Sequence, residues 1–301
     1  MRAVLFDEYG EPDVLHLGET VEPHAGAGQV RIAVEAAGVN GWDWKVRSGA
    51  MAQMMPVQLP AVPGIEAAGV VDEVGPGVEG VAIGDRVFGG GTATTAEHAV
   101  LHAFAPVPSG LSTAEAAALP VAVETSARVL GLLDLEPGQW LVVDGAAGGV
   151  GTTLVQLAVA RGLRVVGTAS EGNHAFLREL GAVPTTYGAW LPDRVSAIVD
   201  GPVSGGLDLV GKGSVADLIA ITGDPGRVVS IADFGAPELG ARVSDGSEGR
   251  AWDALAEVGS LVEADRFRVV VGEVLPWTEA ARAHALSQSG HARGKLVLSV
   301  G

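Results

Sequence analysis

Cysteine is absent from this chain of 301 residues, which excludes disulfides and thiolate metal ligands. Basic residues are few: 19 Lys and Arg stand against 36 Asp and Glu, and the formal net charge is −17. Such an acidic surface repels phosphate backbones and anionic lipids, so we expect neither nucleic acid nor a membrane as partner. The sequence also lacks any apolar run of about 18 residues, the length that a membrane-spanning helix requires.

The N-terminal residues give no sign of a signal peptide. Asp7 and Glu8 come before any apolar run of sufficient length could develop. We therefore expect a cytoplasmic protein. Nearly half of the residues are hydrophobic (48%), so a sizeable buried core is expected.

The first 110 residues have the pattern of short β-strands. Val30, Ile32 and Val34 alternate with less apolar residues and would share one face of a strand. Clusters of Gly and Pro separate the apolar segments, which predicts tight turns and a compact, barrel-like region. The strands expected here cover residues 29–36, 69–74 and 85–88.

Beyond residue 110 the pattern changes to alternating helices and strands. Ser112 and Glu115 form a capping-box signature for a helix over 113–119, which Pro120 ends. Strand–helix–strand alternation with short connections predicts parallel pairing and a doubly wound sheet, hence an α/β fold. The helices expected cover 121–133, 149–161, 174–180 and 278–288. The strands expected cover 139–144, 164–169, 197–200, 227–231, 268–271 and 295–300.

The strongest chemical signal is a glycine-rich turn between a predicted strand and a predicted helix. Gly145, Gly148 and Gly151 have G-x-x-G-x-x-G spacing, in the context that a dinucleotide site requires. A pyrophosphate reaches the unpaired N–H groups of a helix N-terminus only where no side chain intervenes. A tight structural turn is the alternative. The cofactor-binding residues predicted in this turn are Gly145, Ala146, Ala147, Gly148, Gly149, Val150 and Gly151.

The end of the following strand distinguishes between the two nicotinamide cofactors. Dinucleotide sites for NAD usually have Asp or Glu there, and this chain has Ala169. The neighbouring Thr168, Ser170 and Asn173 are small or polar and leave room for a 2′-phosphate. Glu171 argues against a phosphate unless it points away. On balance the segment favours NADPH over NADH.

Several motifs, spread over nearly the whole chain, match the pattern of a known family. They cover residues 37–49, 62–71, 74–78, 84–87, 116–120, 145–151 and 289–298. Through them the chain resembles the zinc-less quinone oxidoreductase branch of the medium-chain dehydrogenase/reductase superfamily. The resemblance implies a discontinuous GroES-like β-barrel catalytic domain, residues 1–121 and 265–301, and a doubly wound Rossmann domain, residues 122–264. It also implies an active site between the two domains, a small-molecule substrate and a homodimer.

The resemblance also indicates the chemistry. Zinc-dependent relatives have a His after Pro-Gly, whereas Ile65 follows Pro63 and Gly64 here, and no metal site is expected. Without a Lewis acid, alcohol oxidation is disfavoured. Hydride transfer from NADPH to a quinone or an α,β-unsaturated carbonyl, such as an enone or enoyl group, is the expected reaction. The alternative is a protein that keeps the dinucleotide fold but acts as a cyclase or isomerase, or has a binding or structural role.

Individual roles follow from the resemblance by position. Asn40 and Asp43 would line the cleft near the nicotinamide. Glu124 stands where relatives often have an apolar or small residue, and it is either a proton donor or a solvent-facing side chain. These three residues, Asn40, Asp43 and Glu124, are the catalytic candidates.

Four further residues are expected at the cofactor. Thr125 would contact the nicotinamide end, and Phe234 would flank the nicotinamide. Tyr187 would lie near the adenosine phosphate, and Lys295 would lie near the cofactor at the domain junction.

Overall fold

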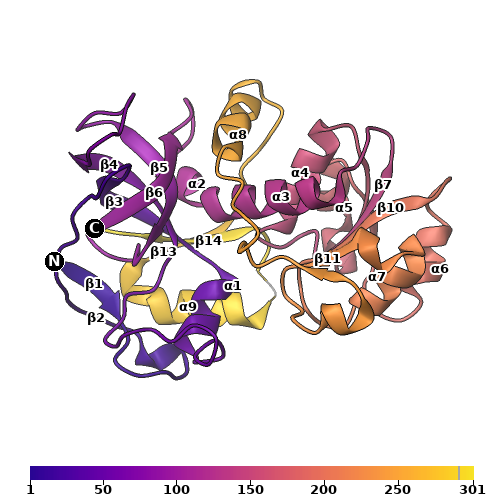
Figure 1. Ribbon diagram of the computed structural model, residues 1–301, viewed down its shortest axis with the longest axis horizontal. Coiled ribbons are helices and arrows are strands. Elements are labelled where there is room, and N and C mark those ends of the chain that lie inside the picture. The colour runs from indigo at the N-terminus through magenta and orange to yellow at the C-terminus, as the bar shows by residue number, and fades with distance from the viewer. Residues whose placement is uncertain (291) are drawn as a thin grey trace. The chain divides into compact units, whose positions relative to one another are not determined.

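The computed structural model describes residues 1–290 and 292–301, and the chain forms two compact units (Figure 1). Unit 1 contains Met1–Val121 and Trp252–Gly301, and unit 2 contains Ala122–Ala251. His291, within the motif at 289–298, lies outside the described residues.

A closed barrel of antiparallel strands is the centre of unit 1. Its strands are β3 (Val30–Val39), β4 (Glu66–Val74), β5 (Arg86–Thr92) and β6 (His98–Pro106). Each pairs with the next, and β6 returns to pair with β3, which closes the barrel. Val30, Ile32 and Val34 are all buried in the barrel core, as their alternation predicts.

The C-terminal end of the chain extends the sheet of this barrel. The order is β13-β14-β3-β4-β5-β6, with β13 (Val271–Pro276) parallel to β14 (Lys295–Ser299) and β14 antiparallel to β3. The prediction of a strand at 268–271 was wrong. The strand begins at Val271 because its partner β14 begins at Lys295, directly opposite.

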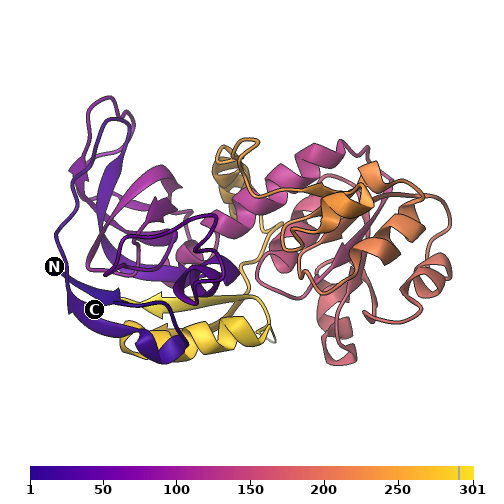
Figure 2. The same cartoon turned by 60° about the horizontal axis from the view of Figure 1, so that its bottom comes forward.

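Short elements complete unit 1. The helix α9 packs along β13 and β14, as Figures 1 and 2 both show. The capping box predicted at Ser112 and Glu115 is present at the start of α2. The remaining elements are β1 (Arg2–Leu5), β2 (His16–Glu19), α1 (Gly41–Arg47), α2 (Thr113–Ala117), α8 (Ala254–Glu263), α9 (Ala280–Ser289) and the 3-10 turns Pro12–Val14 and Trp277–Glu279.

Unit 2 is built on a parallel sheet of order β12-β11-β10-β7-β8-β9. Counted from β7, this is the order 3-2-1-4-5-6 of the doubly wound dinucleotide-binding fold. The order reverses between β7 and β10, the point at which such sheets bind their ligands. The strands are β7 (Trp140–Asp144), β8 (Arg164–Thr168), β9 (Val183–Thr185), β10 (Val203–Asp208), β11 (Val228–Ser230) and β12 (Arg242–Val243).

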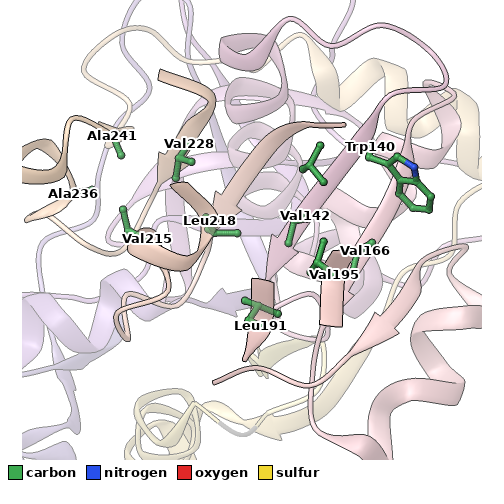
Figure 3. Close-up of a cluster of buried hydrophobic side chains, with 11 residues drawn as sticks. Trp140, Val142, Val166, Leu191, Val195, Val215, Leu218, Val228, Ala236 and Ala241 are labelled. Atoms are coloured by element: carbon green, nitrogen blue, oxygen red, sulfur yellow. The ribbon is translucent and has the colours of Figure 1, made fainter. Parts of the chain in front are cut away.

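Apolar side chains pack on both faces of this sheet. Trp140, Val142 and Val166 join side chains of α6 and α7 in the cluster of Figure 3. The intervening Leu141 and Val143 are buried as well, which explains why β7 is apolar throughout. The helices are α3 (Pro120–Leu133), α4 (Gly151–Ala160), α5 (His174–Glu179), α6 (Leu191–Ser196) and α7 (Val215–Thr222), with 3-10 turns at Glu171–Asn173, Pro225–Arg227 and Ala236–Leu239.

The structure confirms most of the predicted elements in this unit, but the strand predicted at 197–200 was wrong. Those residues follow α6, and the strand is β10 at Val203–Asp208. Gly205 and Gly206 concealed it, because glycine is rare in strands. A Cβ on Gly205 would come within 2.9 Å of the end of the Leu133 side chain, which would have to shift to make room for it.

Candidate functional site

The glycine-rich turn joins the carboxyl end of β7 to α4. Gly145 has a φ of +83°, in the left-handed region that favours glycine, and its N–H donates to Thr168 Oγ1 at 3.1 Å. A Cβ on Gly151 would collide with the carbonyl oxygen of Gly145 and the backbone of Ala146. The start of α4 therefore packs against the turn so closely that only glycine fits at residue 151.

Gly148 has a different environment. A Cβ built there would meet only the Gly145 carbonyl oxygen, at 3.3 Å, so the packing of the protein itself tolerates a side chain. Gly148, Gly149 and Val150 are half-buried, whereas Ala146 and Ala147 are buried. Val150, at the N-cap of α4, makes no side-chain capping bond. Bare backbone at an uncapped helix N-terminus fits a pyrophosphate.

Thr168, the last residue of β8, contacts the turn through its side chain. Its side chain is fully buried, accepts the Gly145 N–H and donates to the Asp144 carboxylate. Ser170, two residues later, is exposed, and Asn173 Nδ2 donates to its Oγ at 3.3 Å. Tyr187 follows the neighbouring β9 and is 60% exposed. Ser170 and Tyr187 thus follow adjacent strands at the same edge of the sheet.

A buried carboxylate that we did not predict holds the loops after β10 and β11. Asp208 accepts the backbone N–H groups of Val210 and Gly211, both at 2.9 Å, and the hydroxyl of Ser230 at 2.7 Å. Ser230 in turn accepts two N–H groups of the next loop, in which Phe234 is 41% exposed. In the sequence, the signal for this carboxylate was an acidic residue, Asp208, at the end of a strand.

A second group of predicted residues meets in unit 1. Asn40 caps α1, and its Nδ2 donates to Glu66 Oε1 at 2.8 Å. Lys295, at the start of β14, donates to the same Glu66 oxygen at 2.5 Å and to Asn40 Oδ1. All three side chains are buried, so the positive charge of Lys295 balances the negative charge of Glu66.

Asp43 lies one helical turn from Asn40 and accepts its backbone N–H at 2.7 Å. Burial raises the pKa of Asp43 to about 7, against the lowering effect of that hydrogen bond and of Lys295. A carboxyl group with such a pKa can both give and take a proton near neutral pH.

Glu66 is a buried member of this cluster that we did not predict. It stands within the motif at 62–71, where we assigned it no role. An acidic residue between Ile65 and Ala67, at the start of an apolar strand, was the available signal, because buried carboxylates almost always have partners.

Glu124 is also engaged with partners. Its fully buried carboxylate accepts bonds from Arg128, Arg250 and the N–H of Ala251. These contacts favour a structural role over the proton donor or the solvent-facing side chain that we considered. Thr125 is buried next to it and its hydroxyl lies 3.4 Å from Glu124 Oε2.

The predicted residues thus form separate groups. Asn40, Asp43 and Lys295 lie together in unit 1, and the expected place of Lys295 near the cofactor stays a prediction. The glycine-rich turn, Ser170 and Phe234 belong to loops at the carboxyl edge of the sheet in unit 2, where Thr168 ends β8. Thr125 lies beside Glu124 in α3. Their roles in catalysis and binding stay predictions.

Comparison with known proteins identifies the family. The alcohol dehydrogenase GroES-like domain matches residues 26–121, and the zinc-binding dehydrogenase family matches residues 191–298. A 2-methylene-furan-3-one reductase of Solanum lycopersicum is 32% identical over 99% of this chain and 79% of its own. The quinone oxidoreductase of Rattus norvegicus is 30% identical over 99% of this chain and 97% of its own.

The chain belongs to the medium-chain dehydrogenase/reductase superfamily. This confirms the resemblance drawn from the motifs. Within the superfamily its relatives are quinone oxidoreductases and enone reductases, so the protein is an oxidoreductase of this family. Among solved structures, a mycobacterial protein in complex with NADPH is 28% identical, covers 99% of both chains and has a TM-score of 0.86.

In the part of the chain that the structure describes, no helix has both the length and the apolar character that crossing a bilayer requires.

Proposed function

We propose that this protein is an NADPH-dependent reductase that transfers hydride to a quinone or to an α,β-unsaturated carbonyl compound, without zinc. One observation carries the proposal. The bare backbone of the turn at 145–151 lies at the carboxyl end of β7, beside the reversal of strand order in a parallel sheet. Dinucleotides bind at this point of the doubly wound fold.

The preference for NADPH rests on the end of β8. Ala169 is buried there and exposed Ser170 follows it, so the position that binds a ribose 2′-hydroxyl in NAD sites has no acid, and the carboxylate of Glu171 comes two residues later. The mycobacterial relative that binds NADPH supports this choice.

The protein's own residues have distinct tasks in the proposed reaction. When bound, NADPH supplies the hydride. The turn at 145–151 would bind the pyrophosphate through backbone N–H groups, and the loop with Phe234 would border the nicotinamide. Asp43, whose pKa burial raises to about 7, would supply the proton to the reduced acceptor, and the backbone N–H of Asn40 holds its carboxyl group in place.

Zinc independence rests on the chemistry of the available ligands. The chain has no Cys, and Ile65, which cannot bind a metal, follows Pro63 and Gly64. A conjugated acceptor is already polarised, so the developing enolate oxygen needs only hydrogen-bond donors. Activity should therefore survive dialysis against a chelator.

The test measures NADPH oxidation at 340 nm with a panel of quinones, enones and simple ketones. Oxidation with the first two classes supports the proposal. Oxidation with simple ketones alone would indicate a carbonyl reductase. NADPH binding without oxidation by any acceptor would indicate the cyclase, isomerase or binding role.

A variant tests the cofactor site separately. Gly148→Leu should weaken NADPH binding at least about tenfold, because the new side chain stands where the pyrophosphate approaches. Gly131→Leu is the matched control, since a Cβ there meets nothing within 4 Å in α3. Equal affinity in both variants would remove the basis of the proposal.

The arrangement of the parts belongs to the proposal too. In this proposal unit 1 is the catalytic domain and unit 2 the dinucleotide-binding domain; the second boundary between the units lies at 251–252, whereas the resemblance implied 264–265. The cytoplasmic location and the homodimer stay predictions, the latter checked by sedimentation.

A further inference from the structure

The chain passes between its two units twice, after Val121 and after Ala251. A buried carboxylate binds the backbone N–H at each of these residues. Glu66 Oε2 accepts the N–H of Val121 at 2.7 Å within unit 1. Glu124 Oε1 accepts the N–H of Ala251 at 3.2 Å within unit 2. The last residue before each passage is thus held by a fully buried carboxylate.

Glu124 is the centre of a larger network of charges. Arg128 Nε donates to Glu124 Oε1 at 2.7 Å, and Arg250 Nη1 donates to Oε2 at 3.2 Å. Arg128 also donates from Nη1 to the hydroxyl of Ser244 and to Glu248 Oε1, the latter at 3.2 Å. The segment from Ser244 to Ala251 is therefore bound to the first turns of α3 at both of its ends.

The same segment is also folded on itself. Gly246 N–H donates to Glu248 Oε2 at 3.0 Å, and Arg250 Nη2 donates to the carbonyl of Asp245 at 3.2 Å. A Cβ on Gly246 would collide with the Arg250 guanidinium, which therefore lies directly over the glycine. In this arrangement Arg250 donates both to the carbonyl of Asp245 and to the carboxylate of Glu124.

Because this network is buried, the loss of one of its members costs more stability than the loss of an exposed ion pair one helical turn apart. Exposed pairs at i and i+4 stabilise a helix by only about 0.3–0.5 kcal/mol. The side chains of Glu124 and Arg128 are 0% and 6% exposed, and loss of one partner leaves a buried charge without compensation. The network also includes a backbone amide 127 residues away in the sequence.

We propose that Glu124 is a positioning residue, a latch that joins the segment 244–251 to the start of α3. Through it the first connection between the units, at the start of α3, and the second connection, at Ala251, move together. Because the hydroxyl of Thr125 lies at the same carboxylate, the latch also orients Thr125. This last consequence rests on the proposed function, in which Thr125 contacts the nicotinamide.

Amide hydrogen exchange tests the latch without any activity measurement. Glu124→Gln removes the charge that holds both arginines, and peptides covering 244–252 should exchange at least about tenfold faster than in the unmodified protein. Asp200→Asn is the matched control, because it neutralises an exposed carboxylate that pairs with Arg164 in the same unit. Its exchange over 244–252 should not change.

A milder variant covers the case in which Glu124→Gln does not fold. Arg250→Gln removes one donor to Glu124 and is half-exposed, so the fold should tolerate it. It should raise exchange in the same peptides by a smaller factor. Unchanged exchange over 244–252 in the variants that fold would overturn the inference.

Kinetics separate the latch from the proposed function. In the latch variants KM for NADPH should rise several-fold more than in Asp200→Asn, and Glu124→Asp, which keeps the charge, should recover part of the loss. Faster exchange in the variants of a protein that never oxidises NADPH would support the latch and refute the proposed function. Unchanged exchange in the variants of an enzyme that does oxidise NADPH would refute the latch and leave the proposed function standing.

Discussion

Asp43→Asn should change how the stability of the protein depends on pH. Asp43 is buried and its pKa is raised from 3.8 to about 7, with burial as the largest cause. Asparagine has the same shape and can still accept the Asn40 N–H through its side-chain oxygen. The substitution therefore removes the titration and keeps the hydrogen bond.

The size and sign of the effect follow from the pKa difference. A folded-state pKa above the unfolded value means that stability from this group is complete below pH 3.8 and is lost as the pH rises through 7. The difference of about three units, at about 1.4 kcal/mol per unit, corresponds to about 4 kcal/mol. The free energy of unfolding of the unmodified protein, minus that of Asp43→Asn, should fall by about this amount between pH 4 and pH 7.

His284 acts in the opposite direction. Burial lowers its pKa from 6.5 to about 3, and the nearby charge of Arg47 adds to the effect. A lowered histidine pKa gives stability that is complete above pH 6.5 and is lost as the pH falls through 3. Between about pH 4 and 6.5 the two groups therefore cancel, and the unmodified protein should show little net slope from them.

Urea denaturation followed by circular dichroism from pH 4 to 8, without cofactor, provides the measurement. Asp43→Asn should be destabilised as the pH falls, because the His284 slope is no longer balanced. His284→Gln should be destabilised as the pH rises, because only the Asp43 slope remains. A constant difference between Asp43→Asn and the unmodified protein across this range would refute the reasoning.

Three further outcomes are expected. Gly151→Ala should lower the melting temperature clearly more than Gly148→Ala. A Cβ at residue 151 collides with backbone atoms, whereas a Cβ at residue 148 meets one atom at 3.3 Å. Equal losses of melting temperature in the two variants would contradict this geometry. Lys295→Met should lower the free energy of unfolding, measured in urea, by about 3–5 kcal/mol, because Glu66 would stay buried without its cation. Arg282→Met removes the cation of an exposed ion pair and should lower the free energy of unfolding far less. Asp208→Asn should speed proteolysis of the loops at 209–211 and 232–235 by weakening their bonds to the carboxylate, and unchanged cleavage would exclude that role.

The predictions succeeded where the relevant signal is local. The alternation of Val30, Ile32 and Val34, and the capping box of Ser112 and Glu115, each depend on residues a few positions apart. The turn at 145–151 is local as well, since β7, the glycines and α4 follow one another directly. The strand at 203–208 was missed because its glycines pack against residues distant in the chain: Gly205 faces Leu133, 72 positions away, and Gly206 faces Leu218 and Val228.

The charged clusters could not be predicted because their members are distant in sequence. Lys295 and Glu66 are separated by 229 residues, and Ala251 and Glu124 by 127. By itself the sequence determined the two kinds of architecture, the glycine-rich turn between a strand and a helix, and the family, because these depend on periodicity, glycine spacing and contiguous motifs. Only the tertiary structure decided which carboxylates are paired with cations and which one, Asp43, has its pKa raised by burial. The pKa and role of a carboxyl group depend on burial and on partners that folding brings from remote parts of the chain.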